Sequence, residues 1–298
     1  MEKRKLGNTD MLVSVLGFGG AEIGFEGATQ QEVNDLLNSA LDAGLNVIDT
    51  ATGYVNSEEM IGKAVSGRRD NYFLFSKCGW SGDTGEDSWK QESILAHIEK
   101  SLRLLKTDRL DLIQLHSCSE DILRKGDVIA TVQKARDKGY TRYIGYSGDG
   151  VAAKCAIGTG AFDTLQTSIN IADQQVLQEN LPKARERGMG VIAKRPIANA
   201  AWKTGKKPEN AYHHEYWERL QKLQYGFLDG NLDDAVSIAL RFTLSQPGVH
   251  TAIVGTKKPG RWKHNAALLE SGPLPEAEID AIRAQWDEIA EASWVGQV

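Results

Sequence analysis

Short apolar runs rich in valine, isoleucine and leucine recur along this chain, and each precedes a longer stretch in which apolar residues repeat with a helical period. This alternation is typical of βα units that feed a parallel sheet. Eight runs have this form, at residues 15–18, 45–48, 72–75, 110–115, 142–145, 164–166, 190–193 and 251–254. Eight parallel strands close a barrel, and such barrels run to about 250 residues or more. The pattern predicts an α/β fold, a single (β/α)8 TIM barrel domain over residues 1–298.

The segments between these runs add detail to the barrel. Thr29 and Glu32 have the spacing of a capping box, which predicts that a helix begins there. Residues 5–13 before the first strand look like a β-hairpin that could plug the barrel floor. The stretches 198–229 and 79–89 show no clear periodicity, and we expect them to be loops that carry function, as long loops in barrels commonly do.

Composition narrows the class of partner. The formal net charge is -5 and no basic block occurs, so we expect no nucleic acid partner. No apolar run approaches the roughly 18 residues of a membrane span, and the basic N-terminus has no apolar stretch after it, so we expect neither a membrane partner nor a secretory signal. Three scattered cysteines lack metal-ligand spacing, which favours a reducing, cytoplasmic setting without a metal. A small-molecule partner is the better expectation.

Ionisable residues stand at the ends of three consecutive predicted strands. Asp49, Lys77 and His116 each follow an apolar run, and Tyr54 comes shortly after the first of them. Strand ends form the active-site face of a β/α barrel. Each residue alone has an ordinary structural explanation, such as a cap, a surface charge or a packed ring. Together they suit proton transfer, because an ammonium lowers the pKa of a phenol, a carboxylate holds the ammonium, and an imidazole bonds the same reacting oxygen.

The same segments resemble the signature segments of the aldo-keto reductase family. They are DTATGYVNSEEMI at 49–61, FSK at 75–77 and DLIQLH at 111–116, and the likeness extends over nearly the whole chain. The resemblance implies that Tyr54 is the general acid, that Lys77 tunes its pKa, and that Asp49 anchors Lys77. It further implies that His116 orients the substrate carbonyl. The implied reaction is the NADPH-dependent reduction of an aldehyde or ketone to an alcohol, with hydride from the nicotinamide and without a metal.

The resemblance also implies residues for the nicotinamide end of the cofactor. Ser147 and Gln166 match family positions that hold the carboxamide. The usual asparagine after the serine is Gly148 here, and Asp149 or Asn170 are candidates to replace it.

Other cofactor positions follow from the same resemblance. Lys194 and Arg195 end the seventh strand, where an aromatic stacking residue is absent, and we expect them to contact the pyrophosphate. The cations Lys257, Lys258 and Arg261 suit the 2′-phosphate of NADPH at a helix start. Gly19 and Gly20 are further predicted cofactor positions, because glycines permit the cofactor to approach the backbone closely. The remaining predicted positions are Gly255, Thr256 and Asn265, of which Asn265 is expected on the adenine side.

Alternative interpretations have weaker support. The glycines at 17–24 invite a Rossmann interpretation, but the predicted helix begins only near Thr29, too late for that motif. A regulatory barrel that binds NADPH with little turnover would not need the complete tetrad of Asp49, Tyr54, Lys77 and His116. A cofactor-free isomerase or aldolase would need Lys77 as a Schiff-base nucleophile, and pairing with Asp49 would keep it protonated.

Aromatic loop residues favour an apolar or aromatic carbonyl substrate; they are Trp80, Trp89, Trp202, Tyr212, Trp217 and Tyr225.

Overall fold

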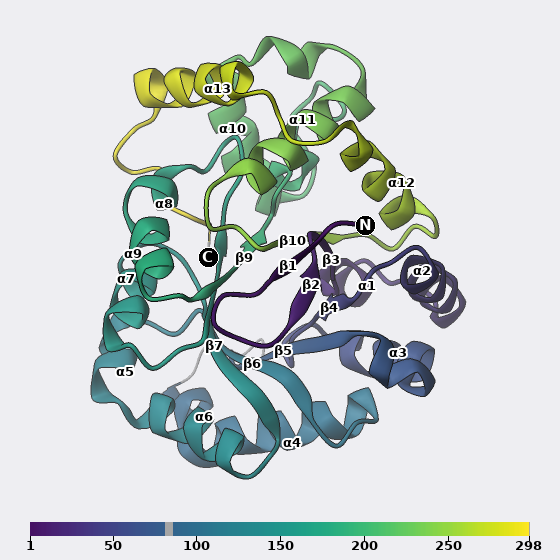
Figure 1. The fold of residues 1–298 in the computed structure, drawn as a ribbon, viewed down its shortest axis with the longest axis vertical. Coiled ribbons are helices and arrows are strands. Elements are labelled where there is room, and N and C mark those ends of the chain that lie inside the picture. The colour runs from purple at the N-terminus through teal and green to yellow at the C-terminus, as the bar shows by residue number, and fades with distance from the viewer. Residues whose placement is uncertain (81–85, 298) are drawn as a thin grey trace.

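Eight parallel strands close into a barrel in the computed structural model, which describes residues 1–80 and 86–297 (Figure 1). Each strand pairs with the next along the chain, and β10 closes the ring on β3. The strands are β3 (Leu16–Gly19), β4 (Val47–Asp49), β5 (Phe73–Gly79), β6 (Leu110–His116), β7 (Thr141–Ser147), β8 (Thr164–Ser168), β9 (Gly190–Lys194) and β10 (Thr251–Gly255). The predicted (β/α)8 fold is confirmed.

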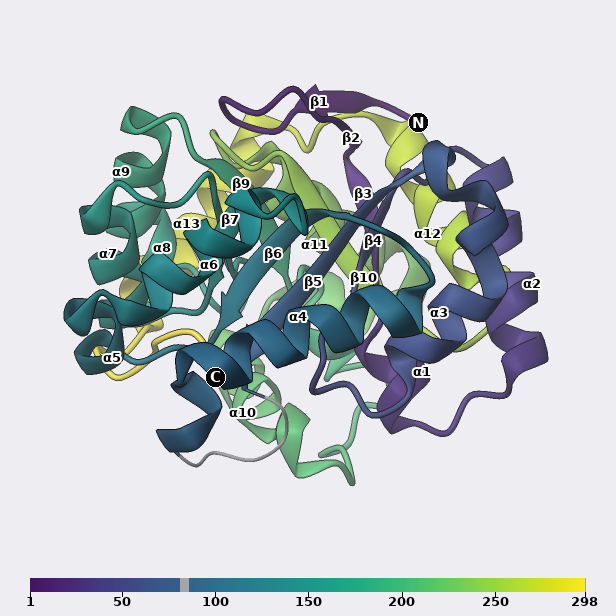
Figure 2. The same cartoon turned by 90° about the horizontal axis from the view of Figure 1, so that it is seen from below.

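Helices surround the barrel, as Figures 1 and 2 show. The longer ones are α2 (Gln30–Asp42), α3 (Ser57–Val65), α4 (Gln91–Leu105), α6 (Asp127–Asp137), α7 (Gly150–Thr159), α10 (His214–Leu223), α11 (Leu232–Ser245), α12 (Arg261–Leu268) and α13 (Glu276–Ile289). The shorter ones are α1 (Ala21–Phe25), α5 (Glu120–Lys125), α8 (Gln175–Gln178) and α9 (Asn180–Glu186). Thr29 caps α2, and a complete capping box with Glu32 confirms the predicted helix start. None of the helices within the described ranges is long and apolar enough to cross a membrane.

The two faces of each strand enter different cores, because successive side chains of a strand point to opposite sides. On β9, Val191 and Ala193 belong to the large core between barrel and helices, whereas Ile192 belongs to a second cluster. That cluster fills the inside of the barrel and consists of Leu6, Met11, Val13, Val47, Phe75, Leu112, Ile192 and Ile253. Asp49, Lys77 and Lys194 each follow a residue of this inner cluster by two positions on the same strand, so their side chains also point inward. The strand pattern therefore carries the ionisable side chains into the mouth above an apolar floor.

The N-terminal hairpin closes the floor of the barrel. Strands β1 (Lys3–Lys5) and β2 (Leu12–Ser14) pair antiparallel, as predicted, and lie across the end of the barrel opposite to α10 (Figure 2). Leu6 and Met11 are completely buried in the inner cluster. Gly7 turns the chain with a positive φ of 54° against β9, where a Cβ would overlap the backbone of Gly190. The hairpin is thus part of the barrel core.

Shortening a plug side chain should destabilise the protein. We expect Met11→Ala to lower the free energy of unfolding by about 2–5 kcal/mol, because it opens a cavity in a closed core. Leu12→Ala, one residue later but 52% exposed, should change it by less than about 0.5 kcal/mol. Urea unfolding of both variants measures the difference. Equal effects would contradict a packed plug.

Two helices were not predicted from the sequence. The stretch 198–229, expected to be irregular, contains α10, which buries Tyr216, Leu220 and Leu223. The glycine-rich segment after β3 continues directly into α1, so the prediction that no helix begins before Thr29 was wrong. Of the expected loop 79–89, residues 81–85 lie outside the described residues, and Glu86–Trp89 form a 3₁₀ turn.

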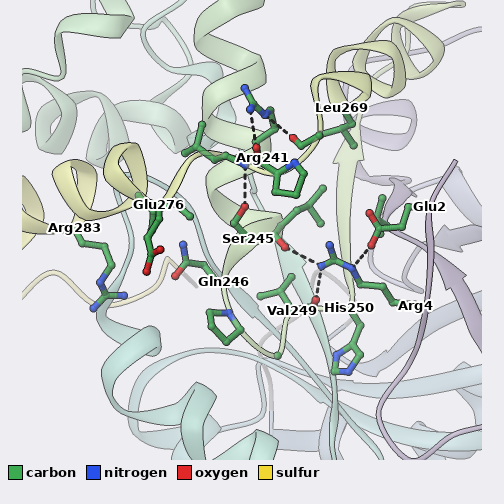
Figure 3. Close-up of a pocket in the computed structure, with 18 of the residues that line it drawn as sticks. Glu2, Arg4, Arg241, Ser245, Gln246, Val249, His250, Leu269, Glu276 and Arg283 are labelled. Atoms are coloured by element: carbon green, nitrogen blue, oxygen red, sulfur yellow. Dashed lines mark hydrogen bonds and ion pairs between the residues drawn. The ribbon is translucent and has the colours of Figure 1, made fainter.

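A cavity of about 800 Å³ lies on the floor side of the barrel (Figure 3). Its walls come from the hairpin, the end of α11 with the following loop, and the start of α13. The Arg4 guanidinium donates to the carbonyls of Leu244 and Val249, and Arg241 donates to those of Gly272 and Pro273. Both guanidinium groups are therefore engaged with the backbone. This cavity is remote from the strand ends that carry the ionisable side chains.

Candidate active site

The four predicted site residues meet at the mouth of the barrel. Asp49 ends β4, Lys77 lies near the end of β5 and His116 ends β6, while Tyr54 follows in the loop between β4 and α3. The Lys77 ammonium pairs with the Asp49 carboxylate and lies 5.0 Å from the centre of the Tyr54 ring. The Tyr54 and His116 rings meet edge to face, with centroids 5.6 Å apart. One cluster therefore contains an acid, an amine, a phenol and an imidazole.

Lys77 is held as a buried ammonium. Its Nζ donates to Asp49 and, at 2.9 Å, to the carbonyl oxygen of Thr50. Burial opposes the charge, but attraction to Asp49 and contact with Tyr54 outweigh it and raise the pKa of Lys77. A protonated amine is a poor nucleophile, which argues against Schiff-base chemistry at this residue.

The Tyr54 phenol keeps its proton in this environment. Burial raises the pKa of Tyr54 above its ordinary value, and the lowering effect of Lys77 only partly offsets that rise. From the sequence, only the lowering effect of Lys77 on this pKa was predicted. The sign of the Lys77 effect was right, but the sequence could not show how far the ring is removed from water. A protonated phenol is the form in which a tyrosine can give a proton.

His116 is neutral at neutral pH. Burial and the neighbouring cations Lys77, Lys194 and Arg195 lower its pKa well below the ordinary value. Trp80 packs edge to face against the imidazole, with ring centroids 5.1 Å apart. A neutral imidazole carries one N–H donor. It can therefore hydrogen-bond a carbonyl oxygen without bringing another positive charge to the mouth.

Gln114 belongs to the same cluster, although it was not predicted from the sequence. Its side chain is fully buried, and its Nε2 lies 3.4 Å from Asp49 Oδ2 and 3.3 Å from Gln166 Oε1. It therefore links the carboxylate of the tetrad to a predicted cofactor residue. The available signal was a polar residue inside an apolar strand, two positions before His116 and hence on the same inward face.

The sequence model of the Aldo/keto reductase family matches residues 15–287. The chain belongs to this family. An uncharacterized oxidoreductase of Bacillus subtilis is 28% identical over 302 residues, which are 95% of this chain and 96% of that protein. An NADH-specific methylglyoxal reductase of Escherichia coli is 26% identical, over 98% and 99% of the two chains. The holo form of an aldo-keto reductase from Bacillus halodurans superposes with a TM-score of 0.81, at 27% identity over 96% of each chain.

Membership in the aldo/keto reductase family makes this chain an oxidoreductase that acts on carbonyl or alcohol groups. Among the predicted carboxamide residues, Ser147 ends β7 and Gln166 lies within β8, both buried. The buried Nε2 of Gln166 lies near the Asp49 carboxylate but forms no well-aligned hydrogen bond to a described residue. This donor therefore suits a ligand carbonyl.

The departure from the family pattern at Gly148 has a steric reason. A Cβ at this position would overlap the Tyr146 ring, whose hydroxyl donates to the carbonyl of Cys118 at 2.7 Å. The two suggested replacements for the missing asparagine are already engaged. Asp149 accepts from Thr167 and Ser168. The Asn170 amide donates to the carbonyl of Arg195 at 3.0 Å, and its side-chain oxygen accepts a backbone N–H.

Lys194 and Arg195 gather around Asp149 in the mouth. The Lys194 ammonium lies 2.8 Å from Asp149 Oδ2, and an Arg195 nitrogen lies 3.9 Å from the same oxygen. Arg195 also donates to the Tyr212 hydroxyl at 2.6 Å and to the carbonyl of Gln297 at 2.7 Å. In this arrangement both cations contact protein groups. Their contact with a pyrophosphate stays a prediction.

The basic loop after β10 leads into α12. Lys257 is half-buried and donates to the carbonyl of Glu26 at 2.8 Å, whereas Lys258 is exposed. Arg261 is the first residue of α12, and Asn265 is buried one turn later. All three cations therefore lie near the start of one helix. Gly255 and Thr256 connect this loop to the mouth, and Gly255 pairs in register with Gly19.

The C-terminal segment also reaches the mouth, which nothing in the sequence indicated. The carbonyl of Gln297 accepts from Arg195, and the Gln297 amide donates to the carbonyl of Tyr212 at 2.8 Å. Of the aromatic loop residues, Trp80 and Tyr212 contact site residues. Trp202 and Tyr225 instead pack into the outer core, so they do not form the expected wall.

Proposed function

We propose that this aldo/keto reductase uses NADPH to reduce an aldehyde or ketone to an alcohol, with Tyr54 as general acid. The observation that carries the proposal is the buried Lys77–Asp49 pair beside a protonated phenol and a neutral imidazole. These are the groups that a proton transfer to a carbonyl oxygen requires.

The residues at the mouth fit a nicotinamide cofactor. Gln166 has a buried amide donor that forms no well-aligned hydrogen bond within the described residues, and Ser147 lies beside it on the neighbouring strand. Gly19 and Gly255 contribute no side chains of their own to the edge of the mouth. Lys258 and Arg261 stand where a helix start and two cations favour a phosphate. When bound, NADPH would supply the hydride, which is the redox half of the reaction.

The chain's own residues would handle the proton. Tyr54 would donate its phenol proton to the substrate carbonyl oxygen as negative charge develops there, and the Lys77 ammonium would stabilise the phenolate that remains. Asp49 fixes the ammonium, and Gln114 in turn contacts Asp49. His116 would donate a hydrogen bond to the same carbonyl oxygen, which orients the substrate.

Apolar side chains at the rim support an apolar or aromatic substrate. Phe25, on α1, is 56% exposed and meets the Tyr54 ring edge to face, with centroids 5.7 Å apart. Val55 is 67% exposed directly after the proposed acid. A substrate with an apolar body can bury these side chains while its carbonyl points to Tyr54.

A panel of aldehydes and ketones, each assayed with NADPH and with NADH, tests the proposal. We expect carbonyl-dependent oxidation of NADPH, with the higher kcat/KM for apolar and aromatic members of the panel. Tight NADPH binding without turnover on any carbonyl would instead favour the regulatory barrel. The NADH-specific relative makes the comparison of the two cofactors informative.

Removing the positive charges of the basic loop should weaken the binding of NADPH much more than the binding of NADH. We expect the double variant Lys258→Ala/Arg261→Ala to raise the Kd for NADPH roughly tenfold to a hundredfold, because charge-assisted contacts contribute about 1.5–3 kcal/mol. The Kd for NADH should change little, since NADH lacks the 2′-phosphate. Lys263→Ala, an exposed lysine on the same helix, is the control. Fluorescence titration measures each Kd, and an equal loss for both cofactors would contradict the assignment.

A further inference from the structure

Glu22 is an acidic residue that the proposed reaction does not use. It lies on α1, at the edge of the mouth where β3 and β10 meet. Its carboxylate rests against the backbone of Gly255, so closely that a Cβ at Gly255 would overlap it. The carboxylate therefore fills the space beside the glycines that the proposed cofactor would approach.

No described cation pairs with this carboxylate. Lys257, on the loop that follows Gly255, donates to the carbonyl of Glu26 and lies 4.0 Å from the Glu26 carboxylate instead. The only hydrogen bond to the Glu22 carboxylate among the described groups comes from its own backbone N–H. A partly buried acid without a cation is costly to keep ionised.

The other charged and titratable groups around α1 do not relieve Glu22. Glu26, on the same helix, repels it. From α3, which packs on α1, Glu58 accepts from Ser76 and Glu59 pairs with Lys63. Tyr54, just before α3, is a neutral phenol. Burial, with a smaller contribution from Glu26, raises the pKa of Glu22 to about 7.

We propose that Glu22 is a cofactor-recognition residue that contacts a phosphate group of the dinucleotide in its protonated form, so that cofactor binding takes up one proton from solvent. This rests on the proposed function. The loop that begins beside Glu22 carries Lys257 and Lys258, and such a loop favours a phosphate as the neighbouring ligand. Two anions in contact cannot both stay ionised, whereas a protonated carboxyl donates a hydrogen bond to a phosphate oxygen. The proton enters at a carboxyl oxygen of Glu22, and no other bond changes.

Calorimetric titration with NADP⁺ at pH 8, in two buffers of different protonation enthalpy, tests the inference by counting protons. We expect the wild-type protein to take up a substantial fraction of one proton, and Glu22→Gln to take up none. In addition, the wild-type Kd should rise with pH above about 7, by up to about tenfold per pH unit, whereas the Kd of Glu22→Gln should stay flat. Glu22→Ala provides a second variant in case the amide disturbs the fold.

Asp173→Asn is the matched control for another acid that titrates in this range. Burial raises the pKa of Asp173 to about 7 as well, but that carboxylate accepts from the buried Tyr216 hydroxyl and lies 3.8 Å from the Arg219 guanidinium. This variant should keep the proton uptake of the wild type. Binding without proton uptake in the wild type, or uptake that persists in Glu22→Gln, overturns the inference and leaves the proposed function intact. No binding of either nucleotide from pH 6 to 9 overturns both.

Discussion

Replacing Tyr54 with phenylalanine should reduce kcat by about a hundredfold to ten-thousandfold, the range that a positioned general acid contributes. The change removes a single hydroxyl and keeps the ring, which packs against Phe25 and His116. The Kd for NADPH should therefore stay within a few-fold of the wild-type value. Single-turnover kinetics and fluorescence titration of the same preparation measure the two quantities.

Tyr140→Phe is the control for the loss of a phenol elsewhere. Its hydroxyl donates to Glu99 on the outside of the barrel, 3.1 Å away, so the variant should keep wild-type turnover. If Tyr54→Phe also keeps wild-type turnover, another group supplies the proton. If Tyr54→Phe instead loses NADPH binding together with turnover, the hydroxyl acts on the cofactor and not on the substrate.

The architecture of the barrel could be predicted because it depends on local pattern. Eight apolar runs with helical stretches between them define the strands, and the rule that strand ends form the active-site face then brings Asp49, Lys77 and His116 together. The same alternation would have identified Gln114, because it lies on the inward face between Leu112 and His116. These predictions needed no knowledge of which segments meet in three dimensions.

The errors concern features that depend on distant contacts. Helix α10 has only 10 residues, and its Arg219 is buried through bonds to Ala172 and Val295, which are far away in the sequence. The contact of Gln297 with Arg195 spans about a hundred residues and has no sequence signal. The sequence predicted the lowering effect of Lys77 on the pKa of Tyr54 but not the larger, raising effect of burial, which a sequence does not show.

The Lys77–Asp49 pair leads to the largest expected effect on stability. Both side chains are at most 2% exposed, so Lys77→Met would leave the Asp49 carboxylate buried without its cation. We expect the free energy of unfolding to fall by about 3–5 kcal/mol at neutral pH, the usual cost of breaking a buried pair on one side. Turnover should also collapse, because no ammonium would stabilise the phenolate of Tyr54.

The pH dependence of this loss distinguishes a buried charge from simple misfit. Burial raises the pKa of Asp49 in the folded protein, with Lys77 opposing the rise, so removal of Lys77 should raise that pKa further. A group with a raised folded pKa binds its proton more tightly when folded, so stability falls as pH rises from the unfolded pKa to the folded one. The loss in Lys77→Met should therefore be smaller at pH 4.5 than at pH 7.5. The double variant Asp49→Asn/Lys77→Met should recover most of the stability but none of the turnover. Urea unfolding at both pH values measures the free energy of unfolding of the two variants. If the loss of stability is independent of pH and persists in the double variant, Lys77 stabilises the barrel by packing alone.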